Sequence, residues 1–150
     1  IKMGMIRLYL TVAVLTLPVC LCANILGIVP IPSYSHQIAF SPLWKELSLR
    51  GHKVTVLTTD PQNDPKLTNL TEIDLSWCYQ FYSDVSTIVE QSVNMWNAVD
   101  IFSGFMEIIA ERQLSHASLQ NLMQGGNNFD VLLVEGLFPE YLPFAEIYNC

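Results

Sequence analysis

The sequence contains few charged residues, and very few of them are basic. Only 14% of its 150 residues are charged, and seven Lys and Arg stand against 14 Asp and Glu, for a net charge of −7. Two of the basic residues, Lys2 and Arg7, lie near the amino end, so no basic patch is left to bind a phosphate backbone. The composition therefore argues against nucleic-acid binding. At 51% hydrophobic residues, the chain is also too apolar to be disordered.

Several motifs of well-known sites are missing from the sequence. No Gly-x-Gly-x-x-Gly follows the first apolar run, no phosphate loop ends in Gly-Lys-Ser/Thr, and no Gly-x-Ser-x-Gly elbow occurs. The three histidines, His36, His52 and His116, lack the spacing of metal ligands. We therefore expect neither a bound cofactor nor a metal ion.

Cysteines are too few for a disulfide scaffold. Of the four, Cys20 and Cys22 fall in the amino-terminal segment discussed next, which leaves Cys78 and Cys150. These two can pair with each other, pair with residues beyond position 150, or stay free, and the sequence does not decide among the three.

Residues 1–23 have the pattern of a secretory signal peptide. A positive start is followed by an apolar core from Leu8 to Leu21, and small residues offer cleavage after Cys22 or Ala23. The alternative is a transmembrane anchor, but the core is shorter than the ~20 residues that a span needs. The sequon at Asn69, Asn69-Leu70-Thr71, fits a glycosylated lumenal loop.

Apolar runs alternate with helical patterns along the rest of the chain. Strands are predicted at residues 24–29, 53–59, 70–75 and 129–134, with helices between them and another helix after Pro139. This alternation indicates an α/β fold, a Rossmann-like parallel sheet with helices on both faces. Because the chain stops within the last helix, we expect residues 24–150 to be an incomplete domain.

The first helix has two possible starts. Ser41 can cap it with Pro42 in the first position, and Gly51 ends it. Alternatively, the helix begins near His36, with Pro42 kinking it. The apolar stripe expected on its buried face consists of Phe40, Leu43, Trp44 and Leu47.

The next helical region is predicted after residue 83, capped by Ser83 or Asp84, and it ends at Gly125. Its apolar residues form three successive stripes, made of Val85, Ile88, Val89, Val93 and Trp96, then Ile101, Phe105, Ile108 and Ile109, then Leu119, Leu122 and Met123. We expect Trp96 and Phe105 to pack in the core rather than to line a pocket.

Two side chains are candidates for chemistry. His36 and Glu135 each follow an apolar run, so both are expected at the carboxyl edge of the sheet, where open α/β sheets bind ligands. An imidazole beside a carboxylate can remove the proton of a hydroxyl. His52 directly follows the helix stop, and a C-terminal helix cap is its expected role.

Longer stretches of the sequence resemble a known family. The segments that carry the resemblance are Pro32-Ser33-Tyr34-Ser35-His36-Gln37, Pro42-Leu43-Trp44-Lys45-Glu46-Leu47 and Arg50-Gly51-His52-Lys53-Val54-Thr55-Val56-Leu57-Thr58-Thr59. In this order and spacing they strongly resemble the membrane-bound UDP-glycosyltransferases of animals. The following Asp60-Pro61 and Leu67-Thr68-Asn69-Leu70-Thr71-Glu72 resemble the insect branch in particular.

The resemblance implies a two-domain GT-B enzyme, of which residues 24–150 are part of the N-terminal, acceptor-binding domain. It implies that His36 deprotonates the acceptor hydroxyl, supported by Glu135, which stands where the family has an aspartate. The UDP-sugar domain and the membrane anchor would lie beyond Cys150.

By this resemblance, the intact protein is an inverting hexosyltransferase of the endoplasmic reticulum. It would transfer glucose, by likeness to the insect branch, from a UDP-sugar to a small lipophilic acceptor held in a largely apolar pocket. A homo-oligomer is compatible with this picture. The rival hypothesis is a non-catalytic lumenal binding protein, in which case this chain alone carries the function.

Overall fold

The computed structural model describes residues 22–81 and 94–150. Within them, four parallel strands form one sheet in the order β3-β2-β1-β4. The strands are β1 (Asn24–Val29), β2 (Lys53–Thr58), β3 (Leu70–Asp74) and β4 (Val131–Val134). The sequence prediction placed all four correctly to within two residues at each end, and the parallel α/β class is confirmed.

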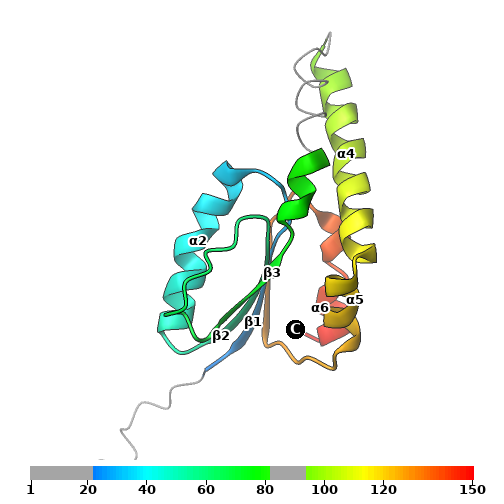
Figure 1. Cartoon of the computed structure of the whole chain (residues 1–150). Helices are drawn as coiled ribbons and strands as arrows, with labels where there is room; N and C mark the ends of the chain where they lie inside the picture. Colours follow the sequence, from blue (N-terminus) through cyan, green and yellow to red (C-terminus); the bar gives the residue numbers. More distant parts are fainter. Residues whose placement is uncertain (1–21, 82–93) are drawn as a thin grey trace, which may run out of the picture.

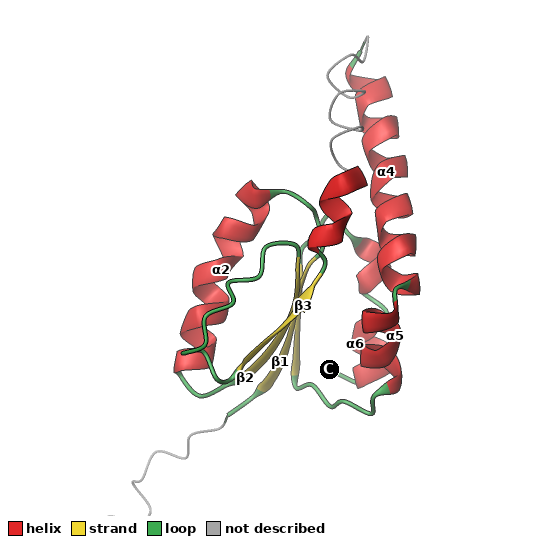
Figure 2. Cartoon of the chain, in the orientation of Figure 1, coloured by secondary structure: helices red, strands yellow, loops and turns green. Residues whose placement is uncertain are grey.

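Helices cover both faces of this sheet (Figures 1 and 2). Helix α2 (Tyr34–Leu49) lies on one face. The other face carries α4 (Met95–Ser115), α5 (Ala117–Gln124) and α6 (Phe144–Tyr148). Short 3-10 turns, η1 (Ser76–Cys78) and η2 (Pro139–Tyr141), follow β3 and β4. The arrangement is Rossmann-like, as expected.

The core is divided by the sheet into two clusters. The larger one joins alternate residues of β1, such as Leu26 and Ile28, to buried side chains of α4, α5 and α6. The smaller one joins Val29 to Trp44 of α2 and to neighbouring strand residues. Because successive strand side chains point to opposite faces, both faces of an apolar strand are buried in such a sheet.

Helix α2 begins earlier than its favoured prediction. It starts at Tyr34 and passes through Pro42, so Ser41 is not its cap, and the alternative start near His36 is correct. The apolar pattern missed the first turns because the residue that faces inward there is Gln37, which is 4% exposed. Leu43, predicted on the buried stripe, is 41% exposed. Gly51 ends the helix as expected, with φ +91°.

The second helical region is only partly described. The predicted caps at 83 and 84 and the residues Val85, Ile88, Val89 and Val93 lie outside the described residues. Trp96, expected in the core, is 73% exposed, because the first turns of α4 extend past the carboxyl edge of the sheet (Figure 1). Phe105 and Ile109 are buried as expected, whereas Ile108 is exposed.

The described residues bear on two further predictions. His52 does not cap α2 through its side chain, because its Nδ1 accepts a hydrogen bond from the backbone N–H of Ala23 at 3.1 Å. Cys78 and Cys150 do not pair with each other, since the first is buried and the second exposed, and both are free among the described residues. Within residues 22–81 and 94–150, no helix is long and apolar enough to cross a bilayer, and the predicted signal peptide lies almost wholly outside them.

Candidate functional site

The carboxyl edge of the sheet brings together the two residues singled out in the sequence. His36 lies in the first turn of α2, just after the link from β1. Glu135 directly follows β4, and its N–H donates to the carbonyl of Ile28 at 2.9 Å, which extends the ladder between β4 and β1. Because β4 pairs with β1, residues far apart in the sequence lie side by side here.

The side chains of His36 and Glu135 contact each other directly. Nδ1 of His36 lies against Oε1 of Glu135 in a hydrogen bond. An ionised carboxylate can only accept hydrogen bonds, so Nδ1 carries the proton. This tautomer leaves Nε2 of the imidazole as an unprotonated nitrogen able to accept a proton.

Burial differs between the two partners. The side chain of His36 is 35% exposed, whereas that of Glu135 is 8% exposed. The second carboxylate oxygen of Glu135, Oε2, is buried with no hydrogen-bond partner among the described residues. A carboxylate held at the protein side of an accessible imidazole can orient the ring and stabilise its cation without blocking its outer edge.

Gln37 anchors the start of α2 beside His36. Its Nε2 donates to the carbonyls of Val29 at 2.7 Å and of Ile31 at 3.0 Å. Its Oε1 accepts a hydrogen bond from the hydroxyl of Thr58 at 2.7 Å. These three bonds hold the turn that presents His36 to the ends of β1 and β2.

Residues at the end of β2 complete this polar network. The hydroxyl of Thr59 donates to the carbonyl of Ile31 at 3.0 Å. Asp60 accepts a hydrogen bond from Tyr79 Oη at 2.7 Å. The sequence analysis did not single out Gln37, Thr58 or Thr59. The sequence feature that could have pointed to them is the pair Pro30 and Pro32. A link with two prolines has few backbone N–H donors of its own.

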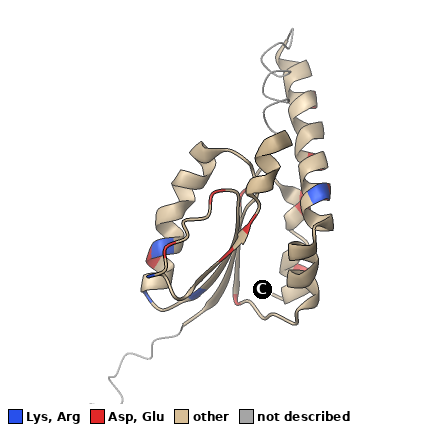
Figure 3. Ribbon diagram, viewed as in Figure 1, with Lys and Arg blue, Asp and Glu red and all other residues tan. Residues whose placement is uncertain are grey.

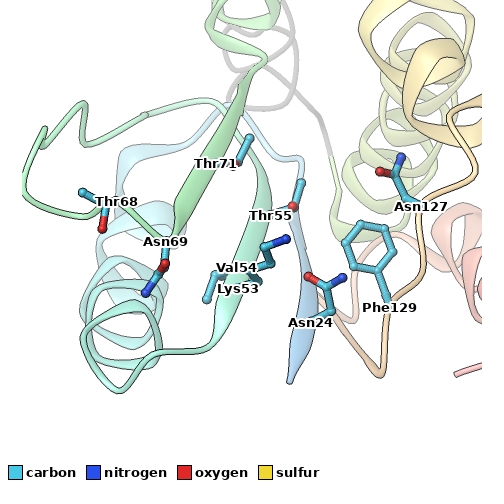
Figure 4. Close-up of a pocket in the computed structure, with 9 residues that line it drawn as sticks. All are labelled: Asn24, Lys53, Val54, Thr55, Thr68, Asn69, Thr71, Asn127 and Phe129. Atoms are coloured by element: carbon cyan, nitrogen blue, oxygen red, sulfur yellow. The ribbon is translucent and has the colours of Figure 1, made fainter. Parts of the chain in front are cut away.

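Two of the cavities among the described residues bear on the predicted sites. One of about 550 Å³ flanks the first turns of α2 on the side of β2 and β3, and mostly polar side chains line it, including Gln37, Asp60, Asn63 and Asp74. The expected apolar acceptor pocket therefore stays a prediction. The other, of about 210 Å³, opens at the opposite, amino-terminal ends of the strands (Figure 4) and is remote from His36.

Asn69, the predicted glycosylation site, lines that second cavity (Figure 4). It is exposed and directly precedes β3, and its side-chain amide donates weakly to the carbonyl of Ser48 at 3.4 Å. The exposure of the Asn69 side chain is therefore compatible with glycosylation, which itself stays a prediction.

Charge and metal-ligating side chains are sparse around the site. Figure 3 shows that most of the few Lys and Arg of the described chain lie around the lower end of α2, away from the carboxyl edge of the sheet, and that another lies on α4. Within residues 22–81 and 94–150, no group of three or more His, Cys, Asp and Glu is arranged to hold a metal ion. What the site offers for chemistry is thus an imidazole supported by a buried carboxylate.

The fold and this pair define an α/β protein with an imidazole beside a carboxylate at the carboxyl edge of its sheet. Comparison with curated proteins gives the family. The chain is 28% identical, over 95% of its length, to an ecdysteroid UDP-glucosyltransferase of Lacanobia oleracea granulosis virus. It is 30% identical, over 75% of its length, to the UDP-glycosyltransferase UGT5 of Dactylopius coccus. It is 25% identical, over 77% of its length, to the UDP-glucuronosyltransferase 2B33 of Macaca mulatta.

The chain therefore belongs to the UDP-glycosyltransferase family, as the sequence motifs indicated. It spans 32%, 22% and 25% of the lengths of these three relatives. No protein-family model and no solved structure matches it.

Proposed function

We propose that the complete protein transfers a sugar from a UDP-sugar donor to a hydroxyl group of a small lipophilic acceptor. The contact between His36 and Glu135 is the observation that carries this proposal. The names of the relatives support the transferase class, and two of the three name specific sugars, glucose in the viral protein and glucuronic acid in the mammalian one. The likeness to the insect branch favours glucose.

His36 acts as the general base in this proposal. Nε2 removes the proton of the acceptor hydroxyl while the acceptor oxygen bonds to the anomeric carbon of the sugar. The bond from that carbon to the UDP oxygen breaks at the same time, and UDP leaves on the opposite face, which inverts the configuration. The donor binds in a part of the protein outside residues 1–150.

Glu135 makes this base effective. Its carboxylate holds the proton on Nδ1, so that Nε2 is the nitrogen that faces the acceptor. Once Nε2 has taken a proton, the buried negative charge stabilises the imidazolium. A positioned base of this kind typically contributes about 10²–10⁴-fold in rate.

The compartment forms part of the same proposal. The signal sequence at residues 1–23 directs the chain into the endoplasmic reticulum, where Asn69 carries a glycan and a membrane anchor outside this chain holds the enzyme. We expect the lumenal enzyme to act on lipophilic compounds that partition into the membrane.

The test uses the complete protein, with purified His36→Ala compared with wild type in an assay of transfer to an alcohol acceptor. Transfer should fall at least about 100-fold, while UDP-sugar binding, measured by calorimetry, stays unchanged. Glu135→Gln should also lose activity, and Glu135→Asp should retain more of it.

His116→Asn is the matched control. It removes an exposed imidazole that lies between α4 and α5, and asparagine can still cap α5. It should leave transfer unchanged. If His36→Ala keeps more than about a tenth of wild-type turnover, His36 is not the base. A protein that binds acceptors but never transfers sugar would favour the rival binding protein.

A further inference from the structure

The side chain of Gln113, in the last turn of α4, is fully buried and joins separate parts of the chain. Its Nε2 donates to the carbonyl of Pro30 at 2.8 Å and to Sγ of Cys78 at 3.1 Å. Its Oε1 accepts a hydrogen bond from the hydroxyl of Tyr141. The amide therefore uses both of its ends inside the core.

Two of these contacts lie on the segments that carry His36 and Glu135. Pro30 begins the link between β1 and α2, which leads to His36. Tyr141 ends η2, which follows Glu135. The buried amide of Gln113 thus connects the segment that precedes His36 to the segment that follows Glu135.

Both paths from Gln113 to the pair are held by hydrogen bonds. On the carboxylate side, Phe138 N–H donates to the carbonyl of Glu135 at 3.3 Å, and Tyr141 N–H donates to that of Phe138 at 3.2 Å. On the imidazole side, Ser33 N–H donates to the carbonyl of Ile31 at 2.8 Å, and His36 N–H donates to that of Ser33 at 3.0 Å. Each end of the amide is therefore connected to the pair through a short series of backbone hydrogen bonds.

We propose that Gln113 is a positioning residue for the transfer reaction, which sets the approach of His36 to Glu135 through Pro30 and Tyr141. This inference rests on the proposed function. An acid–base pair needs its atoms held within a fraction of an ångström, and a displacement of about 1 Å can cost about 10²-fold in rate. The link beyond β1 cannot supply this precision alone, because Pro30 and Pro32 have no N–H to donate.

The chemistry of Tyr141 explains why the amide keeps its orientation. Burial raises the pKa of the Tyr141 hydroxyl, so the phenol stays protonated and acts as a donor toward Oε1 of Gln113. With Oε1 occupied in this way, the NH₂ group of Gln113 must face Pro30 and Cys78. A side chain that fills the space without an amide would leave the carbonyl of Pro30 and the hydroxyl of Tyr141 buried without these partners.

Two variants of the complete protein test the bridge. Tyr141→Phe removes only the hydroxyl, and Gln113→Met removes the amide while keeping a similar volume. Each should lower kcat for transfer by about 10- to 100-fold and change KM for the acceptor by less than about threefold, because the pair loses its alignment while the binding surface stays intact. If Gln113→Met does not fold, Tyr141→Phe decides the question.

Tyr148→Phe is the matched control. Tyr148 lies in the same aromatic cluster, and its hydroxyl donates to the carbonyl of Leu122 at 2.9 Å, on neither segment that carries the pair. It should lower thermal stability by an amount similar to Tyr141→Phe and leave kcat within about twofold of wild type. An equal loss of kcat in both tyrosine variants would overturn the proposal.

A double-mutant cycle with Glu135→Gln separates positioning from general destabilisation. If Gln113 acts through the pair, then adding Gln113→Met or Tyr141→Phe to Glu135→Gln should lower kcat by less than about twofold more. Additive losses would overturn the inference. If His36→Ala abolishes transfer while Gln113→Met and Tyr141→Phe keep full kcat, the proposed function stands and this inference fails. If His36→Ala remains active, the two fail together.

Discussion

Gly27, in the middle of β1, lies directly under the indole of Trp44, and this contact predicts the effect of adding a single methyl group. A Cβ at Gly27 would lie 2.7 Å from Cη2 of Trp44 and 3.0 Å from both Cζ2 and Cζ3. The ring cannot easily retreat, because Trp44 is 3% exposed and stacks on Phe40 with centroids 5.9 Å apart. Gly27→Ala must therefore push α2 away from the sheet or distort β1.

The expected cost follows from opposing terms. Overpacking a core by one methyl group typically costs about 1–3 kcal/mol, and replacing a strand glycine recovers roughly 0.5–1 kcal/mol of backbone entropy. We expect a net destabilisation of about 1–2 kcal/mol. In a domain of this size, that corresponds to a fall of about 2–8 °C in the unfolding temperature.

The assay is thermal unfolding of the complete protein, followed by circular dichroism, for Gly27→Ala, Trp44→Leu and the double variant. Trp44→Leu alone opens a cavity and should also destabilise. In the double variant the new methyl group fills part of that cavity, so the combined loss should be smaller than the sum by about 1 kcal/mol or more. An unchanged transition in Gly27→Ala, or additive losses in the double variant, would refute the packing argument.

Other predictions follow from single sites. Gly104 lies within α4, and a Cβ there meets nothing within 4 Å, so Gly104→Ala should raise stability by roughly 0.5–1 kcal/mol in the same unfolding assay, and a loss would show a hidden contact. Burial raises the pKa of Cys78 to about 11, so at pH 8 only about one thiol in 10³ is ionised. Iodoacetamide followed by mass spectrometry should therefore modify the exposed Cys150 well before Cys78, and equal rates in the folded protein would contradict the burial. The exposed Asn69 should carry a glycan in insect cells, so glycosidase should increase the gel mobility of the wild type and have a smaller effect on Asn69→Gln. An identical glycosidase shift in both proteins would locate the glycan elsewhere.

The comparison of sequence and structure shows where local patterns suffice. The strand β1 was predicted with its exact bounds, and β2 was predicted to within one residue. Both are continuous or nearly continuous runs of apolar and β-branched residues, which mark strands buried on both faces. Gly51, which has a positive φ, likewise marks the end of α2. This helix end can be predicted from the local sequence alone, because glycine adopts the left-handed conformation at little cost.

Local patterns failed where a polar residue, not an apolar one, occupies the buried position of a helix. The favoured start of α2 at Ser41 was wrong, and the alternative near His36 correct, because the inward position of the first turn is filled by Gln37. The partners of Gln37 are two carbonyls and a threonine hydroxyl at the ends of β1 and β2. Trp96 is large and apolar yet exposed, because α4 extends beyond the sheet that would cover it. Periodicity describes one element at a time and contains no information about the length of its neighbour.

The sequence by itself determined the alternation of strands and helices, the parallel sheet, and the position of His36 and Glu135 each just after a strand, because these follow from the order of side chains along one segment. Only the tertiary structure decided that β4 lies next to β1, and therefore that the imidazole and the carboxylate meet. The buried amide of Gln113, which joins Pro30 and Tyr141 across the core, is likewise a product of packing, since hydrogen bonds between distant segments depend on how the whole chain folds.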